Sequence, residues 1–572
     1  MTSEQDRRLP LAAVAVALVA ALCYANSLAN GYTFDDQYIV AGNDLVRAHS
    51  FVGAFTHLYW PPVVGAGQYR PLVIASFVLD WGISHGAPWW FHLVNVLWHV
   101  AASVLVWRLL EQLMPPAGAL AGALLFAVHP VHVEAISNIV GRSELMMTVG
   151  VLAALLAHRR GHWSAVPWFA LAILSKESGI VFVGLAALHD ARLTDDWRTT
   201  FRARRPLYAA YGAVAMAFAA VFHLVAGSGK IVVPALTWIG ASTGARWLTM
   251  LGIVPEYARL LLVPLQLRVE YGPAVTMLAT GLTLPIVLGV FLLVLAALVL
   301  VRSWQRAPVV AVGLLWFVIA ISPVSNVLFP SGIVLAERTL YLPSVGAAMI
   351  AGWLVCWAAE SGRQRSAEWA VAAICLAFAV RSWTRTPIWH DNKAMFVESL
   401  RTEPESYRLH VMAALVFAKA NRYDDAANEY RTARMIYTHN SAAYSGAAEC
   451  ALTAHDDVAA AALLDSAIAQ SKDDYYGYMR LAEVREMQKD WPAALASAKQ
   501  AVALAPDTIR VVDALALAAW HLRDFADADA AYRRAMADLP NNKHLRHDYA
   551  AMVRARDDTA ARRAEAIGRT GS

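Results

Sequence analysis

The chain has 572 residues, of which 58% are hydrophobic and only 16% are charged, a composition too apolar for an ordinary soluble protein. Its formal net charge of +4 is small and dispersed, which argues against a nucleic-acid partner. The four cysteines include three in apolar segments, so neither a disulfide framework nor a thiolate metal site is predicted.

The apolar residues are concentrated in the first two thirds of the chain. Repeated apolar segments there predict membrane spans, whereas the remainder is alanine-rich and charged and has no such segment. We therefore predict an all-α protein in four parts. They are a polytopic membrane bundle at 1–385, a connector at 386–404, a repeat domain at 405–542, and a helical cap with a disordered tail at 543–572.

Eleven apolar segments are interpreted as spans, with Arg7 and Arg8 before the first one fitting a retained signal anchor better than a cleaved signal peptide. The basic residues between spans predict which loops are cytoplasmic. This orientation requires 245–263 to be an interfacial or re-entrant helix. Eleven crossings put the repeat domain outside the cytoplasm, and twelve would put it inside. The predicted spans are 9–28, 89–111, 117–130, 143–157, 163–175, 178–190, 206–226, 281–301, 308–322, 342–359 and 367–381.

With this orientation, the unusual polar residues all fall in loops on the outer face of the membrane. We expect a binding or active site there, because polar groups at membrane depth are costly unless they have a function. The outer segments are 29–88, 129–142, 175–178, 227–280 and 322–343.

The C-terminal part carries an internal repeat. Alanines recur every 34 residues at Ala426, Ala460, Ala494 and Ala528, and this period is that of tetratricopeptide repeats. We predict four repeats across 405–542. Such arrays present a concave groove to peptides or partner proteins, although a dimerisation or stability module stays open as an alternative.

Asp35 and Asp36 follow the first predicted span directly. A carboxylate at the membrane surface can deprotonate a hydroxyl acceptor, or it can act as a cap or ion-pair partner, and both interpretations stay open for the pair. Glu134 is a candidate second acid in the next outer loop. His129 and His132 beside it could bind a divalent metal or form a hydrogen-bond network, so metal dependence is left undecided.

Four cations lie in the same outer loops, namely Arg70, Arg142, Lys176 and Arg338. Arginine and lysine bind phosphate well, and arginine does so with two hydrogen bonds at once. Any one of them could simply anchor the chain at the lipid headgroups. Together with the carboxylates they suggest a pocket for a lipid phosphate.

An ordered set of motifs resembles the transmembrane and tetratricopeptide repeat-containing O-mannosyltransferases. The order of these motifs and the C-terminal repeats both agree with that family, although it often has more repeats. The motifs are Phe34-Asp35-Asp36, Tyr69-Arg70-Pro71-Leu72, Phe91-His92-Leu93-Val94-Asn95 with His99, 129–135, Gly141-Arg142, Lys176-Glu177 and Glu337-Arg338-Thr339-Leu340-Tyr341-Leu342-Pro343.

The resemblance implies a GT-C glycosyltransferase fold and a polyprenyl-phosphate sugar as donor substrate. It also implies an acidic base in the first outer loop, here Asp35 or Asp36, and basic residues of later loops on the lipid phosphate. His129, His132, Glu337 and Tyr341 are expected to support the site. The composition suggests a bacterial relative, with the active site and repeats on the periplasmic face of the inner membrane.

The expected reaction is inverting transfer of mannose or a similar hexose to a protein hydroxyl, with the repeats engaging the acceptor protein and the bilayer holding the donor. Two alternatives stay open. The same chemistry could act on a polysaccharide or lipid, or the chain could be a non-enzymatic membrane-anchored scaffold.

Overall fold

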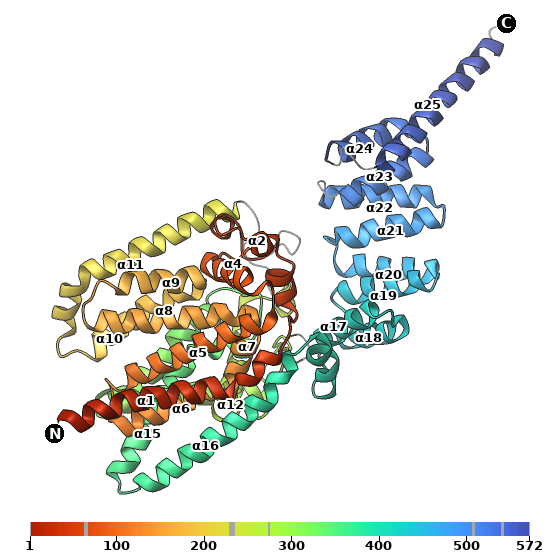
Figure 1. Ribbon diagram of the computed structural model, residues 1–572. Helices are drawn as coiled ribbons and strands as arrows, with labels where there is room; N and C mark the ends of the chain where they lie inside the picture. Colours follow the sequence, from red (N-terminus) through yellow and green to blue (C-terminus); the bar gives the residue numbers. More distant parts are fainter. Residues whose placement is uncertain are drawn as a thin grey trace. The chain divides into compact units, whose positions relative to one another are not determined.

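The computed structural model describes residues 2–61, 67–227, 235–272, 275–505, 509–538 and 543–570, and within these ranges it contains helices and turns but no β-strand. The chain divides into two compact units, Met1–Pro404 and Glu405–Ser572. The first is an apolar helical bundle and the second is a stack of helical hairpins (Figure 1).

The first unit contains a helix at each of the eleven predicted spans. Five helices of the described residues are long and apolar enough to cross a membrane, or six if the pair Pro116–Val128 and Pro130–Ser137, bent by 46°, is one span. The chain is thus a multi-pass membrane protein, while eleven crossings stay a prediction. The helices are α1 (Thr2–Cys23), α5 (Pro88–Leu110), α6 (Pro116–Ala127), α8 (Arg142–Arg159), α9 (Ala165–Ser175), α10 (Val181–Arg192), α11 (Trp197–Ala226), α13 (Leu284–Arg306), α14 (Pro308–Ile321), α15 (Ser344–Glu360) and α16 (Gln364–Arg385).

Four shorter α-helices and one long one lie in the predicted outer loops. They are α2 (Asp44–Arg47), α3 (Gly53–Thr56), α4 (Pro71–Ser84), α7 (Val133–Ser137) and α12 (Thr243–Leu262). The helix α12 contains the segment that the sequence predicts to be interfacial or re-entrant, and it packs against α13. Its position in the membrane stays a prediction.

Helices α6 and α15 pack closely through small residues. A Cβ atom at Gly122 would lie 2.5 Å from the carbonyl oxygen of Ala348, and one at Gly118 would lie 2.5 Å from that of Gly352. Glycine at these positions lets the two backbones approach, as small residues commonly do between membrane helices. This contact matters for the site because α6 leads into the loop of Glu134 and α15 follows the loop of Arg338.

The second unit contains four helical hairpins in its described residues. Its repeat alanines lie at the contacts between helices, since Ala426, Ala460, Ala494 and Ala528 are all fully buried. Small side chains at these positions let paired helices pack tightly. The hairpins are α17 (Tyr407–Lys419) with α18 (Tyr423–Ile436), α19 (Ala442–Thr453) with α20 (Asp457–Gln470), α21 (Tyr475–Met487) with α22 (Trp491–Leu504), and α23 (Ile509–His521) with α24 (Phe525–Asp538).

The last predicted part, a helical cap with a disordered tail at 543–572, contains a single helix. This helix, α25 (Lys543–Thr570), follows the last hairpin (Figure 1). The alanine- and arginine-rich composition of this segment favours a helix, because both residues rank among the strongest helix formers.

Candidate active site

The loops predicted to share the outer face meet at one end of the membrane unit. Ion pairs join Arg338 to Glu134 and Arg70 to Glu177, and the backbone N–H of Gly31 donates to the carbonyl of His390 at 2.9 Å. These bonds connect segments up to about 360 positions apart in the chain. A polar region built from distant loops at one end of an apolar bundle has the character of a binding site.

Asp36 is a fully buried residue whose side chain is hydrogen-bonded to the outer segment 129–142. Its carboxylate accepts from the backbone N–H groups of Val140 at 2.9 Å, Thr33 at 3.2 Å and Ile139 at 3.4 Å. Burial raises the pKa of Asp36 to about 7, outweighing the lowering by the N–H groups of Val140 and Thr33. These contacts favour a positioning role for Asp36.

Asp35 lies beside Asp36 and is only half-buried. Its negative charge contributes to the raised pKa values of both Asp36 and Arg338. The preceding residue, Phe34, has a φ of +41°, which is strained for a side chain of this size. Strained backbone is frequent at active sites, and here it occurs directly before the more exposed aspartate.

Glu134 and Arg338 form one unit. Glu134 accepts the backbone N–H of Arg338 at 2.8 Å and makes an ion pair with its guanidinium group. Burial lowers the pKa of Arg338, but Glu134 and Asp35 outweigh this effect and raise it overall. With 30% of its side chain exposed, Arg338 is the most accessible of the four candidate cations. Glu134 as a second acid stays a prediction.

Arg70 and Lys176 are each held by a carboxylate. Arg70 donates to both oxygens of Glu177, at 3.0 and 2.7 Å, and Lys176 forms an ion pair with Glu144. Their side chains are only 11% and 9% exposed. A phosphate would therefore share these cations with their carboxylate partners.

Arg142 lies in the core, with a side chain that is 0% exposed. Its guanidinium group pairs with Asp80 and donates to Asn95 Oδ1 at 2.8 Å, Ser76 Oγ at 3.1 Å and the carbonyl of Phe91 at 2.9 Å. These contacts argue against Arg142 as a phosphate ligand. They indicate that it ties α4 and α5 to the start of α8.

His129 uses both ring nitrogens for hydrogen bonds. Nε2 donates to the carbonyl of Leu261 at 3.0 Å, and Nδ1 accepts the backbone N–H of Val131 at 3.2 Å. A metal at either nitrogen would have to displace one of these bonds. The geometry therefore favours the network interpretation for His129.

His132 and Tyr341 belong to a buried cluster beneath the outer loops. His132 Nε2 lies 2.9 Å from Ser344 Oγ, and the Tyr341 hydroxyl lies 2.7 Å from His99 Nδ1. The rings of His132 and Tyr341 pack with centroids 4.5 Å apart. This cluster links α5 and α15 and supports the loop that carries Arg338.

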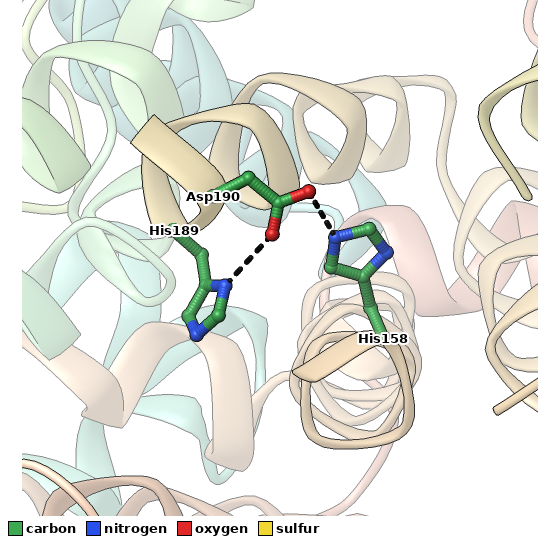
Figure 2. A group of neighbouring side chains, drawn as sticks. All are labelled: His158, His189 and Asp190. Atoms are coloured by element: carbon green, nitrogen blue, oxygen red, sulfur yellow. Dashed lines mark hydrogen bonds and ion pairs between the residues drawn. The ribbon is translucent and has the colours of Figure 1, made fainter. Parts of the chain in front are cut away.

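One other group has the spacing of a metal site. Of the described residues, only His158, His189 and Asp190 bring three ligand atoms within 4.8 Å of one another. Figure 2 shows the Asp190 carboxylate joined to both imidazole rings. The Asp190 carboxylate also pairs with Arg204 and accepts a hydrogen bond from the Tyr208 hydroxyl at 2.9 Å. A positive guanidinium group on the shared carboxylate opposes a cation, so these contacts favour an ion-pair network.

Glu337 is a buried support for the loop of Arg338. One of its oxygens accepts the backbone N–H of Arg268 at 2.6 Å and the Tyr271 hydroxyl at 2.9 Å. Burial raises its pKa to about 8, with Arg385 opposing the shift and Glu134 adding to it.

The raised pKa values of Asp36 and Glu337 predict that the stability of the folded protein falls as the pH rises. Between the ordinary carboxyl range and about pH 7 to 8, the folded protein keeps protons on Asp36 and Glu337 that the unfolded chain has lost. The melting temperature of detergent-purified protein should therefore fall by several degrees from pH 6 to pH 9. Glu337→Gln should reduce the fall, because the glutamine amide does not titrate. The amide oxygen can still accept both hydrogen bonds of Glu337.

The exposed Glu398 supplies the matched control, and Glu398→Gln should leave the pH dependence unchanged. A wild-type melting temperature that is constant from pH 6 to pH 9, or a Glu337→Gln variant with the full fall, would contradict this account.

Sequence reasoning missed the carboxylate partners of the cations. Asp80, Glu144 and Glu177 pair with Arg142, Lys176 and Arg70. Asp80 offered a signal, because an acidic residue inside the apolar segment of α4 needs a buried partner. Glu144 and Glu177 offered none, since charges at helix ends are common.

Comparison with known proteins identifies a group of similar proteins. Residues 77–224 match the family described as dolichyl-phosphate-mannose-protein mannosyltransferase. The human protein O-mannosyl-transferase TMTC3 is 25% identical over 439 residues, covering 68% of this chain and 47% of the relative. The chain is a relative of the protein O-mannosyl-transferases.

Further comparisons mark the extent of the likeness to the protein O-mannosyl-transferases. The Drosophila melanogaster protein O-mannosyl-transferase Tmtc1 is 35% identical over 187 residues, which are 30% of this chain and 22% of that protein. The chain spans about half the length of the TMTC3 proteins it matches. Among solved structures, the match to the crystal structure of MamA covers 26% of this chain and 85% of the MamA chain, with 17% sequence identity and a TM-score of 0.24.

Proposed function

We propose that this chain is an inverting membrane glycosyltransferase that moves mannose or a similar hexose from a polyprenyl-phosphate carrier to a hydroxyl group of a protein. The observation that carries the proposal is the Glu134–Arg338 ion pair, at the end of the bundle where distant loops meet, with the charge of Asp35 acting on the same arginine. An accessible carboxylate beside an accessible arginine supplies both a base and a charge for a leaving phosphate.

In the proposed reaction, Asp35 takes the proton of a serine or threonine hydroxyl. The hydroxyl oxygen attacks the anomeric carbon of the sugar, and the bond from that carbon to the phosphate oxygen breaks. The polyprenyl phosphate leaves with the electron pair of this bond. Arg338 stabilises the negative charge, with Lys176 and Arg70 as the further candidate cations.

The remaining candidates take supporting roles in this proposal. Asp36 holds the loop of Asp35, and Glu134 orients Arg338. The chain would work in the inner membrane with the site and repeats facing the periplasm. No step requires a divalent metal.

The repeat unit supports a protein acceptor because it contains an open, mostly apolar cavity of about 550 Å³. The cavity lies among the first two hairpins and the start of the third. A volume of this size accommodates a few side chains of a bound peptide. Its lining includes Met412, Leu415, Tyr430, Ser445, Glu449 and Tyr476.

A charge placed in this cavity should weaken protein modification. Leu415 lines the cavity and is 42% exposed, so Leu415→Glu should leave the fold intact and lower transfer to a protein acceptor at least about tenfold. Release of sugar from the donor in the absence of acceptor should be unchanged. The measurement is radiolabelled sugar transfer in proteoliposomes.

Met435→Glu is the matched control, because Met435 is 80% exposed and lies outside the cavity. Equal loss in both variants would remove the cavity from the proposal. Transfer that survives deletion of 405–572 would favour a polysaccharide or lipid acceptor. Protein that releases no sugar from any polyprenyl-phosphate donor would favour the scaffold alternative.

A further inference from the structure

Tyr59 carries a buried hydroxyl group that has no hydrogen-bond partner among the described residues. Its side chain is only 2% exposed and belongs to the apolar cluster around Val73 and Phe77. Its backbone N–H donates to the carbonyl of Gln68 at 2.7 Å, which holds the residue in place. A buried hydroxyl without a partner is unfavourable and uncommon in folded proteins.

Tyr59 lies beside a charged group of the candidate active site. The guanidinium carbon of Arg70 lies 5.0 Å from the centre of the Tyr59 ring. The charges of Asp35, Asp36 and Arg338 also act on the phenol group. Tyr59 therefore places an unpartnered hydroxyl group on the residue that packs against one of the candidate phosphate-binding arginines.

The phenol stays protonated in this environment. Burial raises the pKa of Tyr59 well above its usual value, and Asp35 and Asp36 add to this effect while Arg70 and Arg338 oppose it. A neutral phenol cannot act as the base of the reaction. It can donate a hydrogen bond to an anion, and such bonds are stronger than those between neutral groups.

We propose that Tyr59 is a substrate-contact residue whose hydroxyl donates to a phosphate oxygen of the lipid-linked sugar. This proposal rests on the proposed function, which supplies the phosphate. The position beside Arg70 favours the phosphate over the acceptor hydroxyl, because this arginine attracts an anion to that place.

Tyr59→Phe tests the proposal because it removes only the hydroxyl and keeps the ring against Arg70. We expect the variant to fold with an unchanged melting temperature in the absence of substrate. The KM for the polyprenyl-phosphate sugar should rise at least about tenfold, while the KM for the acceptor should not change.

A binding measurement gives a second readout that needs no turnover. Polyprenyl phosphate without sugar should raise the melting temperature of the wild type, and Tyr59→Phe should lose most of this rise. Inorganic phosphate and neutral polyprenol serve as separate arms that divide the phosphate contribution from the lipid contribution. Tyr532→Phe is the matched control, since Tyr532 also has a buried hydroxyl without a partner but lies in the repeat unit.

The possible outcomes separate this proposal from the proposed function. If polyprenyl phosphate stabilises the wild type and Tyr59→Phe equally, the contact is refuted and the reaction stands. If the KM for the acceptor rises instead, the hydroxyl serves the acceptor and the phosphate assignment is wrong. If the wild type neither binds polyprenyl phosphate nor releases sugar, the proposed donor fails, and this contact fails with it.

Discussion

Asp35→Asn should abolish sugar transfer and leave the protein folded. The proposed base would lose its ability to accept a proton while its size and shape are kept. General-base catalysis commonly contributes about 10² to 10⁴-fold, so we expect a loss of at least about 100-fold in kcat. The measurement is transfer from a polyprenyl-phosphate sugar to a peptide, together with the melting temperature of the purified variant.

Asp36→Asn is the informative comparison. Both oxygens of Asp36 accept backbone N–H groups, with Val140 on one oxygen and Ile139 and Thr33 on the other. In Asp36→Asn, the NH₂ group would replace one of these oxygens and face backbone N–H groups, so donors would meet donors there. Each buried donor left without an acceptor costs about 1–3 kcal/mol, so Asp36→Asn should lower both stability and activity.

The pair of variants distinguishes the two candidate bases. An Asp35→Asn variant with wild-type activity would remove Asp35 from the mechanism. A stable but inactive Asp36→Asn variant beside an active Asp35→Asn variant would identify Asp36 as the base.

Arg142→Met should strongly destabilise the membrane unit. The change leaves the Asp80 carboxylate buried without its positive partner and leaves Asn95 Oδ1 without its donor. Removing one member of a buried ion pair commonly costs about 3–5 kcal/mol. We expect a large fall in melting temperature and in the yield of folded protein.

A second change tests the cause. In the double variant Arg142→Met with Asp80→Asn, no charge is left buried, and the asparagine oxygen can still accept the Trp90 indole N–H that Asp80 accepts at 3.1 Å. Part of the lost stability should therefore return. A stable Arg142→Met protein with a raised KM for the donor would instead restore Arg142 to the phosphate pocket.

The sequence predicted the helices well because their signals are local. Each of the eleven apolar segments overlaps a helix, since a long apolar run in a membrane can satisfy its backbone only within itself. The 34-residue period likewise predicted four hairpins, because small residues recur wherever paired helices must approach. The extent of the last helix, α25, was not predicted, because composition alone does not separate a charged helix from disorder.

The candidate site was predicted only in part. The sequence grouped the outer-loop cations as candidates, but their carboxylate partners lie between 32 and 204 positions away in the chain. Nothing local marks Glu134 as the partner of Arg338, or Asp80 as the partner of Arg142. Tyr59 was missed because a single tyrosine in a loop has no distinctive pattern.

The sequence by itself determined that this protein is an apolar helical bundle followed by a helical repeat, with its unusual polar residues in one set of loops. Hydrophobic segments and repeat periods are properties of neighbouring residues, so they can be read without a structure. Only the tertiary structure decided which of the two aspartates is buried. It did so because the backbone N–H groups that hold Asp36 come from a loop about one hundred residues away.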